Sequence, residues 1–156
     1  MDSIVESNKL NFKLSKDERL HHRSLVEGLF RFGNSFYEFP FRVTYRSMTT
    51  EELEKNFRDH VPEGISSLQM MVTVPKKKRR KAVDRVLMRR RIREAYRLNK
   101  HRLKQDVDML PGIKTFSVAL VYIHDKNMPY DFIESKIKKV LTKLQAKINI
   151  KECHES

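Results

Sequence analysis

The chain contains 156 residues, of which 33 are Lys or Arg and 20 are Asp or Glu, and its formal net charge is +13. This length allows one domain with a small core but not two, and no apolar run approaches the roughly 20 residues of a transmembrane helix. Since the N-terminus has neither the basic start nor the apolar segment of a signal peptide, we expect a cytoplasmic protein with no membrane partner.

The N-terminal part predicts one helix after a mobile segment. Residues 1–14 carry no periodic pattern and are expected to be mobile. Ser15 and Glu18 have capping-box spacing, which predicts a helix over Lys16–Phe32 that ends at Gly33. The side of this helix that would pack inward carries Leu25, Leu29 and Phe32, with Val26 and Phe30 beside them.

Half of the fourteen aromatic residues lie between Phe30 and Tyr45. From Phe39 to Arg46 apolar and polar residues alternate, which predicts a strand with one apolar face. Pro40 has no backbone N–H, so it makes this an edge strand or splits it into two short ones. We expect most of these rings in the core, and the rest could stack on unpaired bases, with Arg42 or Arg46 on the adjoining phosphates.

Residues 47–67 are acidic and polar, which favours mainly a loop with at most one short helical turn. Its carboxylates Glu51, Glu52 and Glu54 have no His or nucleophile at a supporting spacing, so we expect them to be solvated. Alternating apolar residues over 68–74 then predict a second strand.

The positive charge is concentrated in residues 76–104, where fifteen Lys or Arg face only Asp84 and Glu94. Lys76–Lys81 are six consecutive cations that repel one another, which favours an extended or looped connector. From Asp84 onward the period is helical. One side of this helix carries Met88, Ile92, Ala95, Tyr96, Asn99 and Leu103, and the neighbouring side carries Arg89, Arg90, Arg93, Arg97, Lys100 and Lys104.

Such a basic side can simply be solvated. Here cations four residues apart repel with few carboxylates nearby, and a phosphate backbone would offset that repulsion. We therefore expect the connector and helix to contact nucleic acid. The residues assigned to this contact are Lys76, Lys77, Lys78, Arg79, Arg80, Lys81, Arg85, Arg89, Arg90, Arg93 and Arg97.

The C-terminal part predicts a buried strand and a final helix. Pro111-Gly112 indicates a turn, and residues 116–123 are almost wholly apolar, as in a strand that is covered on both faces. Residues 130–147 have the clearest helical period in the chain, and residues 149–156 are expected to fray. Cys153 is the single cysteine, so no internal disulfide can form.

No catalytic or metal-binding pattern emerges. The six histidines have no metal-ligand spacing, Asp106 and Asp108 lack a third acidic ligand, and no nucleophile has a plausible base. The order of elements predicts an α+β fold, a single small domain with helices packed on a mixed sheet.

The sequence from Val74 to Arg97 resembles the signature of the bacterial ribonuclease P protein component. The matching residues are Val74, Pro75, Lys76, Lys77, Ala82, Val83, Arg85, Arg89, Arg90, Ile92, Arg93, Glu94, Ala95, Tyr96 and Arg97. Two features depart from the pattern: Val86-Leu87 stands where the family usually has Asn-Arg, and the loop before Ala82 lacks the glycine often found there.

The resemblance implies a domain over residues 15–148 whose four-stranded sheet resembles that of the second domain of ribosomal protein S5, with a left-handed β-α-β crossover. It also implies a function: the RNA-binding subunit of ribonuclease P, which assists a catalytic RNA in endonucleolytic removal of the 5′ leader from precursor tRNA. Mg²⁺ would enter through the RNA subunit. A cleft between the first helix and the sheet would hold the leader, and the residues assigned to it are Phe30, Phe41, Arg42 and Tyr45.

Two other classes stay open on the sequence. A structural RNA-binding protein, ribosomal or involved in assembly, would explain the charge but not the ordered signature. A DNA-binding or nuclear protein is also conceivable, because Lys76–Lys81 is similar to a nuclear localisation run.

Overall fold

The computed structural model describes residues 12–58 and 60–155, with side chains described up to residue 148. The predicted α+β class is confirmed, with five α-helices and a four-stranded mixed sheet in a single domain. The elements in chain order are the 3₁₀ helix η1 (Lys16–Glu18), α2 (Arg23–Phe32), β1 (Asn34–Glu38), β2 (Phe41–Met48), α3 (Thr50–Asn56), β3 (Leu68–Thr73), α4 (Ala82–Asn99), α5 (His101–Asp108), β4 (Thr115–Tyr122) and α6 (Tyr130–Glu155).

The sheet has the strand order β1-β2-β4-β3. The β1–β2 and β2–β4 pairs are antiparallel, whereas β3 and β4 are parallel and joined through α4 and α5. The predicted break at Pro40 is confirmed, because the chain turns there from β1 at the sheet edge into β2. The hand of the β3–β4 crossover stays a prediction.

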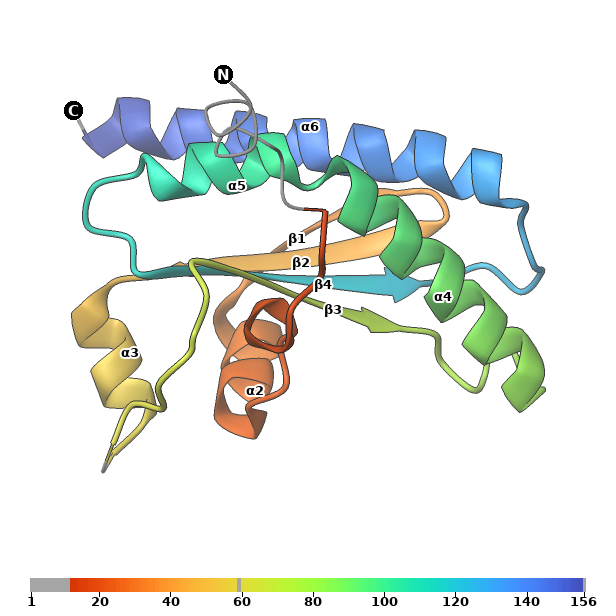
Figure 1. The fold of residues 1–156 in the computed structure, drawn as a ribbon, viewed down its shortest axis with the longest axis horizontal. Helices are drawn as coiled ribbons and strands as arrows, with labels where there is room; N and C mark the ends of the chain where they lie inside the picture. The colour runs from red at the N-terminus through yellow and green to blue at the C-terminus, as the bar shows by residue number, and fades with distance from the viewer. Residues whose placement is uncertain (1–11, 59, 156) are drawn as a thin grey trace, which may run out of the picture.

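The sheet separates two layers of helices (Figure 1). One face lies under α4, α5 and α6, and its buried cluster includes Phe41 and Val43 of β2 with Met88 and Ile92 of α4. The other face lies under α2 and α3, and its smaller cluster includes Leu25, Leu29, Met48, Leu53 and Ala119. The strand β4 is buried along nearly its whole length, as its apolar sequence predicted.

The predicted continuous helix over residues 16–32 is wrong. The capping interaction exists, since the Glu18 carboxylate accepts a hydrogen bond from the Ser15 backbone N–H at 2.8 Å. The chain nevertheless leaves the helix after Glu18, because Arg19 pairs with Met70 of β3 and the Leu20 N–H donates to the Met70 carbonyl at 2.8 Å. A regular helix, α2, begins only at Arg23.

The prediction of mainly a loop over residues 47–67 missed α3. Its first turn is capped reciprocally: the Glu52 N–H donates to the Thr49 hydroxyl, and the Thr49 N–H donates to the Glu52 carboxylate, each at 3.2 Å. Leu53, a residue of this helix, is buried. The Thr-x-x-Glu spacing followed by an apolar residue was the sequence signal for it.

Local structure extends beyond the expected limits at both ends of the described chain. Of the predicted mobile segment 1–14, residues 1–11 lie outside the described residues, while Phe12 packs edge-on against His101. At the other end, the backbone of α6 stays helical to Glu155, beyond the predicted end at residue 147. Among the described residues, no helix combines the length and hydropathy that crossing a bilayer requires.

Candidate RNA interface

The basic connector, residues 76–81, is a turn rather than an extended segment. The Lys78 and Arg79 backbone N–H groups both donate to the Pro75 carbonyl, at 3.0 and 3.1 Å. Five of its six residues are exposed: Lys76, Lys77, Lys78, Arg80 and Lys81. The turn therefore presents five cations to solvent within a short length of chain.

Arg79 differs from its five neighbours, because protein groups already hold its guanidinium. It forms an ion pair with Asp84 of α4 at 3.0 Å and donates a hydrogen bond to the Asp125 carbonyl in the β4–α6 loop. The sequence placed Arg79 among the phosphate ligands, and the structure gives it a different role. It anchors the connector to α4 and to the loop before α6.

The helix α4 buries the apolar side that the sequence predicted. Met88, Ile92, Ala95 and Tyr96 are all at most 1% exposed. Near its start, Nη1 of Arg85 donates to the carbonyls of Arg79 and Arg80, at 2.9 and 2.7 Å. Arg85 thus orders the connector as well as contributing positive charge.

Three cations in the middle of α4 have no carboxylate partner within the described residues. Arg90 and Arg93 are exposed and Arg89 is half-buried. Burial lowers the pKa of Arg93, and the positive charges of Arg19 and Arg89 lower it further. Together with the exposed connector residues, these three form the outer basic surface: Lys76, Lys77, Lys78, Arg80, Lys81, Arg89, Arg90 and Arg93.

Arg19 is the residue of this region that sequence analysis missed. It lay inside the predicted helix over residues 16–32, where its spacing gave no reason to connect it with α4. Its pairing with Met70 of β3 instead brings its charge close enough to act on Arg93. Only the tertiary structure therefore reveals where Arg19 lies, because its position depends on where the chain leaves η1.

The cations toward the C-terminal end of the basic stretch are held internally. Arg97 pairs with Glu94 at 2.5 Å and donates to the Phe12 carbonyl at 3.1 Å. The hydrogen bond that Arg97 donates to the Glu94 carboxylate raises the pKa of Arg97. Lys100, predicted on the basic side, is only 3% exposed and pairs with Glu18 at 2.6 Å. Lys104 pairs with Asp108 at 3.1 Å.

Arg91 belongs with these internally held residues, since it donates to the Met128 carbonyl at 2.6 Å. We call this set the anchored cations: Arg79, Arg91, Arg97, Lys100 and Lys104. Arg97 was assigned to RNA contact from the sequence. Its hydrogen bonds to Glu94 and to the Phe12 carbonyl show that it links α4 to the N-terminal segment.

The structure divides the four residues assigned to a leader cleft. Phe41 is fully buried against Tyr122 on the face under α4–α6, so the assignment of its ring to base stacking is wrong. Tyr45 lies on the same face, stacked on Phe116 with ring centroids 6.0 Å apart, and burial raises the pKa of its hydroxyl. These two residues sit on the opposite side of the sheet from α2.

Phe30 and Arg42 remain available for a ligand. Phe30 of α2 is 47% exposed, and Arg42 is exposed on the strand face that α2 covers. Phe32, which the sequence predicted on the inward side of the first helix, is instead 64% exposed, and Tyr37 is exposed as well. Arg46 lies on this same face, with its guanidinium 5.3 Å from the centroid of the Phe32 ring.

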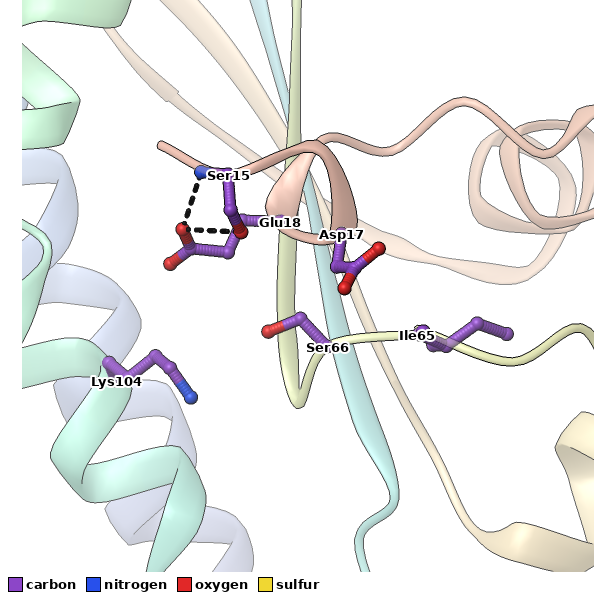
Figure 2. Close-up of a pocket in the computed structure, with 7 residues that line it drawn as sticks. Ser15, Asp17, Glu18, Ile65, Ser66 and Lys104 are labelled. Atoms are coloured by element: carbon purple, nitrogen blue, oxygen red, sulfur yellow. Dashed lines mark hydrogen bonds between the residues drawn. The ribbon is translucent and has the colours of Figure 1, made fainter. Parts of the chain in front are cut away.

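An open pocket of about 310 Å³ lies where the N-terminal segment meets the loop before β3 and α5 (Figure 2). It is lined by Ser15, Asp17, Glu18, Gly64, Ile65, Ser66 and Lys104. Within the part of the chain that the structure describes, no three His, Cys, Asp or Glu side chains gather closely enough to hold a metal ion.

Comparison with known proteins gives one consistent family. A family model described as Ribonuclease P matches residues 14–145. Two proteins named ribonuclease P protein component, from two strains of Porphyromonas gingivalis, are 33% and 31% identical to the chain over 138 residues. Each match covers 88% of this chain and 90% of the relative.

Solved structures show the same fold at lower identity. The Staphylococcus aureus RNase P protein matches with a TM-score of 0.55 and 18% identity, over 80% of this chain and 93% of that one. The Thermotoga maritima RNase P protein matches with a TM-score of 0.54 and 21% identity, over 81% of this chain and 96% of that one.

Proposed function

The chain belongs to the ribonuclease P family, and on that premise we propose that it helps a catalytic RNA to remove the 5′ leader from precursor tRNA. As a ribonuclease P protein component, it is a subunit of an endoribonuclease holoenzyme whose partner is the ribonuclease P RNA. The role for precursor tRNA rests on the two surfaces that follow.

The outer basic surface is the observation that carries the proposal. Eight cations, most of them exposed, project from one turn and one helix, and none pairs with a carboxylate in the described residues. Such a group displaces condensed counterions from phosphates and neutralises part of the RNA charge. A second RNA, itself an anion, can then approach the catalytic RNA at a lower electrostatic cost.

The second surface, on the α2 side of the sheet, is proposed to hold the leader. Phe30 offers a ring on which an unpaired base can stack, and Arg42 offers a guanidinium for the neighbouring phosphate. Mature tRNA lacks the leader, so contacts here would favour precursor over product. Phe41 and Tyr45, on the other face, have no part in this proposal.

The resemblance assigns Mg²⁺ to the RNA subunit, and we keep that assignment as a proposal. We also propose a cytoplasmic location, where tRNA precursors and their processing RNA meet. Both statements come from the family and the sequence, and the experiments on the two surfaces do not test them.

The main experiment measures leader removal from a precursor tRNA by ribonuclease P RNA at low Mg²⁺, with and without this chain. We expect the chain to stimulate cleavage and the variant Arg89→Glu, Arg93→Glu to lose that stimulation. The matched control is Lys55→Glu, Lys147→Glu, which reverses two exposed charges elsewhere. Binding without any stimulation would favour a structural RNA-binding protein instead, and full stimulation by the Arg89, Arg93 variant would remove the outer basic surface from the mechanism.

Two further measurements test the basic surface and the leader site independently. If roughly six cations pair with phosphates, affinity should fall by about three orders of magnitude between 50 and 200 mM salt. Loss of a stacked base costs about 1–3 kcal/mol, so Phe30→Ala should reduce the preference for precursor over mature tRNA by about tenfold. Equal preference in Phe30→Ala and the unmodified chain would refute the leader site while leaving the basic surface intact.

A further inference from the structure

The two-residue turn between β1 and β2 carries a phenylalanine that is open to solvent. Hairpin turns of this length usually contain Gly, Asn or Asp, which fit the turn backbone and are well solvated. Here the turn is Phe39-Pro40, and Phe39 is 51% exposed. An exposed aromatic ring at such a position is a candidate contact surface, provided that it belongs to a larger group of residues.

Two rings from a distant part of the chain hold Phe39 in place. The centroid of the His124 ring lies 4.9 Å from that of Phe39 with the planes 68° apart, and the Phe132 centroid lies 6.4 Å away at 70°. His124 follows β4, Phe132 lies in the first turn of α6, and both are half-buried. We call these three residues the aromatic cluster. The edge-on contacts fix the Phe39 ring while about half of the residue stays in solvent.

The charges around the aromatic cluster are mixed. Nζ of Lys136 lies 5.4 Å from the centroid of the Phe132 ring, and Lys126 is exposed in the β4–α6 loop. The carboxylate of Asp125 is exposed as well, 3.5 Å from Nδ1 of His124. A phosphate would meet this carboxylate, whereas a neutral nucleobase would not be repelled. The cluster is therefore suited to a base.

The aromatic cluster adjoins the outer basic surface. The backbone carbonyl of Asp125 accepts a hydrogen bond from Arg79 of the connector. The Ile123 N–H donates to the Pro40 carbonyl at 2.9 Å, which joins the same loop to the β1–β2 turn. In Figure 1 the connector, the β4–α6 loop and the β1–β2 turn lie at one end of the sheet. An RNA that binds the exposed connector cations is therefore close to the aromatic cluster.

The cluster is separate from the proposed leader site. Arg42 is exposed on the face that α2 covers, whereas Phe132 packs against the core cluster of the opposite face. In a double helix the neighbouring base pairs cover both faces of each base, so only an unpaired base can stack on a protein ring. The occupant that fits is an unpaired nucleotide of the RNA on the outer basic surface.

We propose that Phe39, held by His124 and Phe132, stacks on one unpaired base of the ribonuclease P RNA. This inference deepens the proposed function and rests on it for the identity of the RNA. Because the ring is already fixed, little side-chain freedom is lost on binding. The contact adds affinity that does not depend on charge, next to a surface that acts through charge.

The test measures the affinity for ribonuclease P RNA by filter binding between 50 and 200 mM salt. Phe39→Ala should lower the affinity by about tenfold through loss of the stacked base. The loss should be the same at every salt concentration, because no phosphate contact is removed. Phe39→Tyr keeps the ring and should bind like the unmodified chain. Phe39→Leu keeps a large apolar side chain without a ring and should bind as weakly as Phe39→Ala.

Two results would overturn the proposal directly. Full affinity in Phe39→Leu would mean that any apolar side chain suffices. A changed slope of log affinity against log salt in Phe39→Ala would mean that the connector cations had been displaced. The control Met109→Ala removes an apolar side chain just after α5 that is 81% exposed, and should leave the affinity unchanged.

Folding of each variant is checked by near-ultraviolet circular dichroism and urea unfolding. Should Phe39→Ala fail to fold, the comparison of Phe39→Leu with Phe39→Tyr replaces it, because both keep a large side chain against His124 and Phe132. A tenfold difference between these two variants supports the stacking contact, and equal affinity contradicts it.

Other occupants are tested with the same variants. Precursor tRNA alone and a fully paired RNA duplex should each bind Phe39→Ala and the unmodified chain equally. A tenfold loss on either RNA would overturn the assignment to an unpaired base of the ribonuclease P RNA. A dimer that sedimentation detects for the unmodified chain and not for Phe39→Ala would show that a second copy occupies the cluster instead.

Leader removal separates this inference from the proposed function. Binding that depends on the ring, without any stimulation of cleavage, would refute the function and support the stacking contact. Normal stimulation, with equal affinity of Phe39→Ala and the unmodified chain, would do the reverse.

Discussion

The outer basic surface and the anchored cations come from one basic stretch of chain but have opposite environments. At its N-terminal end, Lys76–Lys78 and Arg80 are exposed without carboxylate partners in the described residues. At its C-terminal end, Lys100 is buried against Glu18 and Lys104 is bound to Asp108. Residues of both groups contribute equally to the net charge. Only those of the first group can bind a phosphate without breaking a contact within the protein.

The difference follows from what surrounds each end of the stretch. The start of α4 projects past the ends of the strands, whereas its end lies beside α5 and α6 (Figure 1). In the first region, among the described residues, a carboxylate pairs only with Arg79, through Asp84, whereas the second region is met by Glu18 from the N-terminal segment and Asp108 from α5. The comparison teaches that the RNA-binding capacity of a basic helix is set by nearby acceptors, as well as by its own cations.

The largest effect is expected where an anchored cation is buried. Lys100→Met would leave Glu18 as an unpaired buried carboxylate, which typically costs about 3–5 kcal/mol. We expect the free energy of unfolding, measured with urea, to fall by about that amount. Arg90→Gln, on the outer basic surface, should change it by less than about 0.5 kcal/mol. Equal stability of the two variants would abolish the distinction between the groups.

A matched pair of double variants tests the distinction in RNA binding. Arg89→Gln, Arg93→Gln and Arg97→Gln, Lys104→Gln each remove two positive charges from neighbouring parts of the stretch. The first should lower the salt slope by about 1.8, so that its affinity falls about tenfold less between 50 and 200 mM salt than that of the unmodified chain. The second should lower it by much less, because its cations are already paired. Equal slopes would show that net charge alone governs binding.

The pH dependence of stability reports on the anchored pair directly. Burial alone would raise the pKa of Glu18, but hydrogen bonds from Lys100 and Ser15 and the charge of Lys100 outweigh it, so the pKa lies below its ordinary 4.5. The pair therefore contributes stability that is full above about pH 4.5 and is lost as pH falls through the folded-state pKa.

Each unit of depression corresponds to about 1.4 kcal/mol. Urea unfolding between pH 6 and 3 should show a steeper loss for the unmodified chain than for Glu18→Gln, Lys100→Met. Parallel curves for the two proteins would mean that Glu18 gains nothing from Lys100.

The smallest expected effect compares two adjacent residues of the connector. Arg79 is paired with Asp84, whereas Arg80 is exposed. Arg79→Gln should change RNA affinity at 100 mM salt by less than about twofold but lower stability by about 1 kcal/mol, since it breaks an anchoring contact. Arg80→Gln should do the opposite, lowering the salt slope by about one. Filter binding and urea unfolding of both variants decide this.

Most of the fold could be predicted because its signals are local. Alternation along 68–74 and the helical period of 130–147 predicted β3 and α6, and Pro40 predicted the break between β1 and β2. The errors lie where tertiary contacts override local preference. The helix expected over residues 16–32 is interrupted because Leu20 bonds to β3, which lies far away in the sequence.

By itself, the sequence determined where the positive charge lies, which face of α4 is apolar, and which family the chain resembles, because charge, period and motif are properties of neighbouring residues. Only the tertiary structure decided which of the positively charged side chains are exposed and which are buried or paired. It buried Lys100 against Glu18, brought Arg19 close to Arg93, and enclosed the ring of Phe41. Burial and pairing depend on segments distant along the chain, so no local pattern could have assigned these three residues.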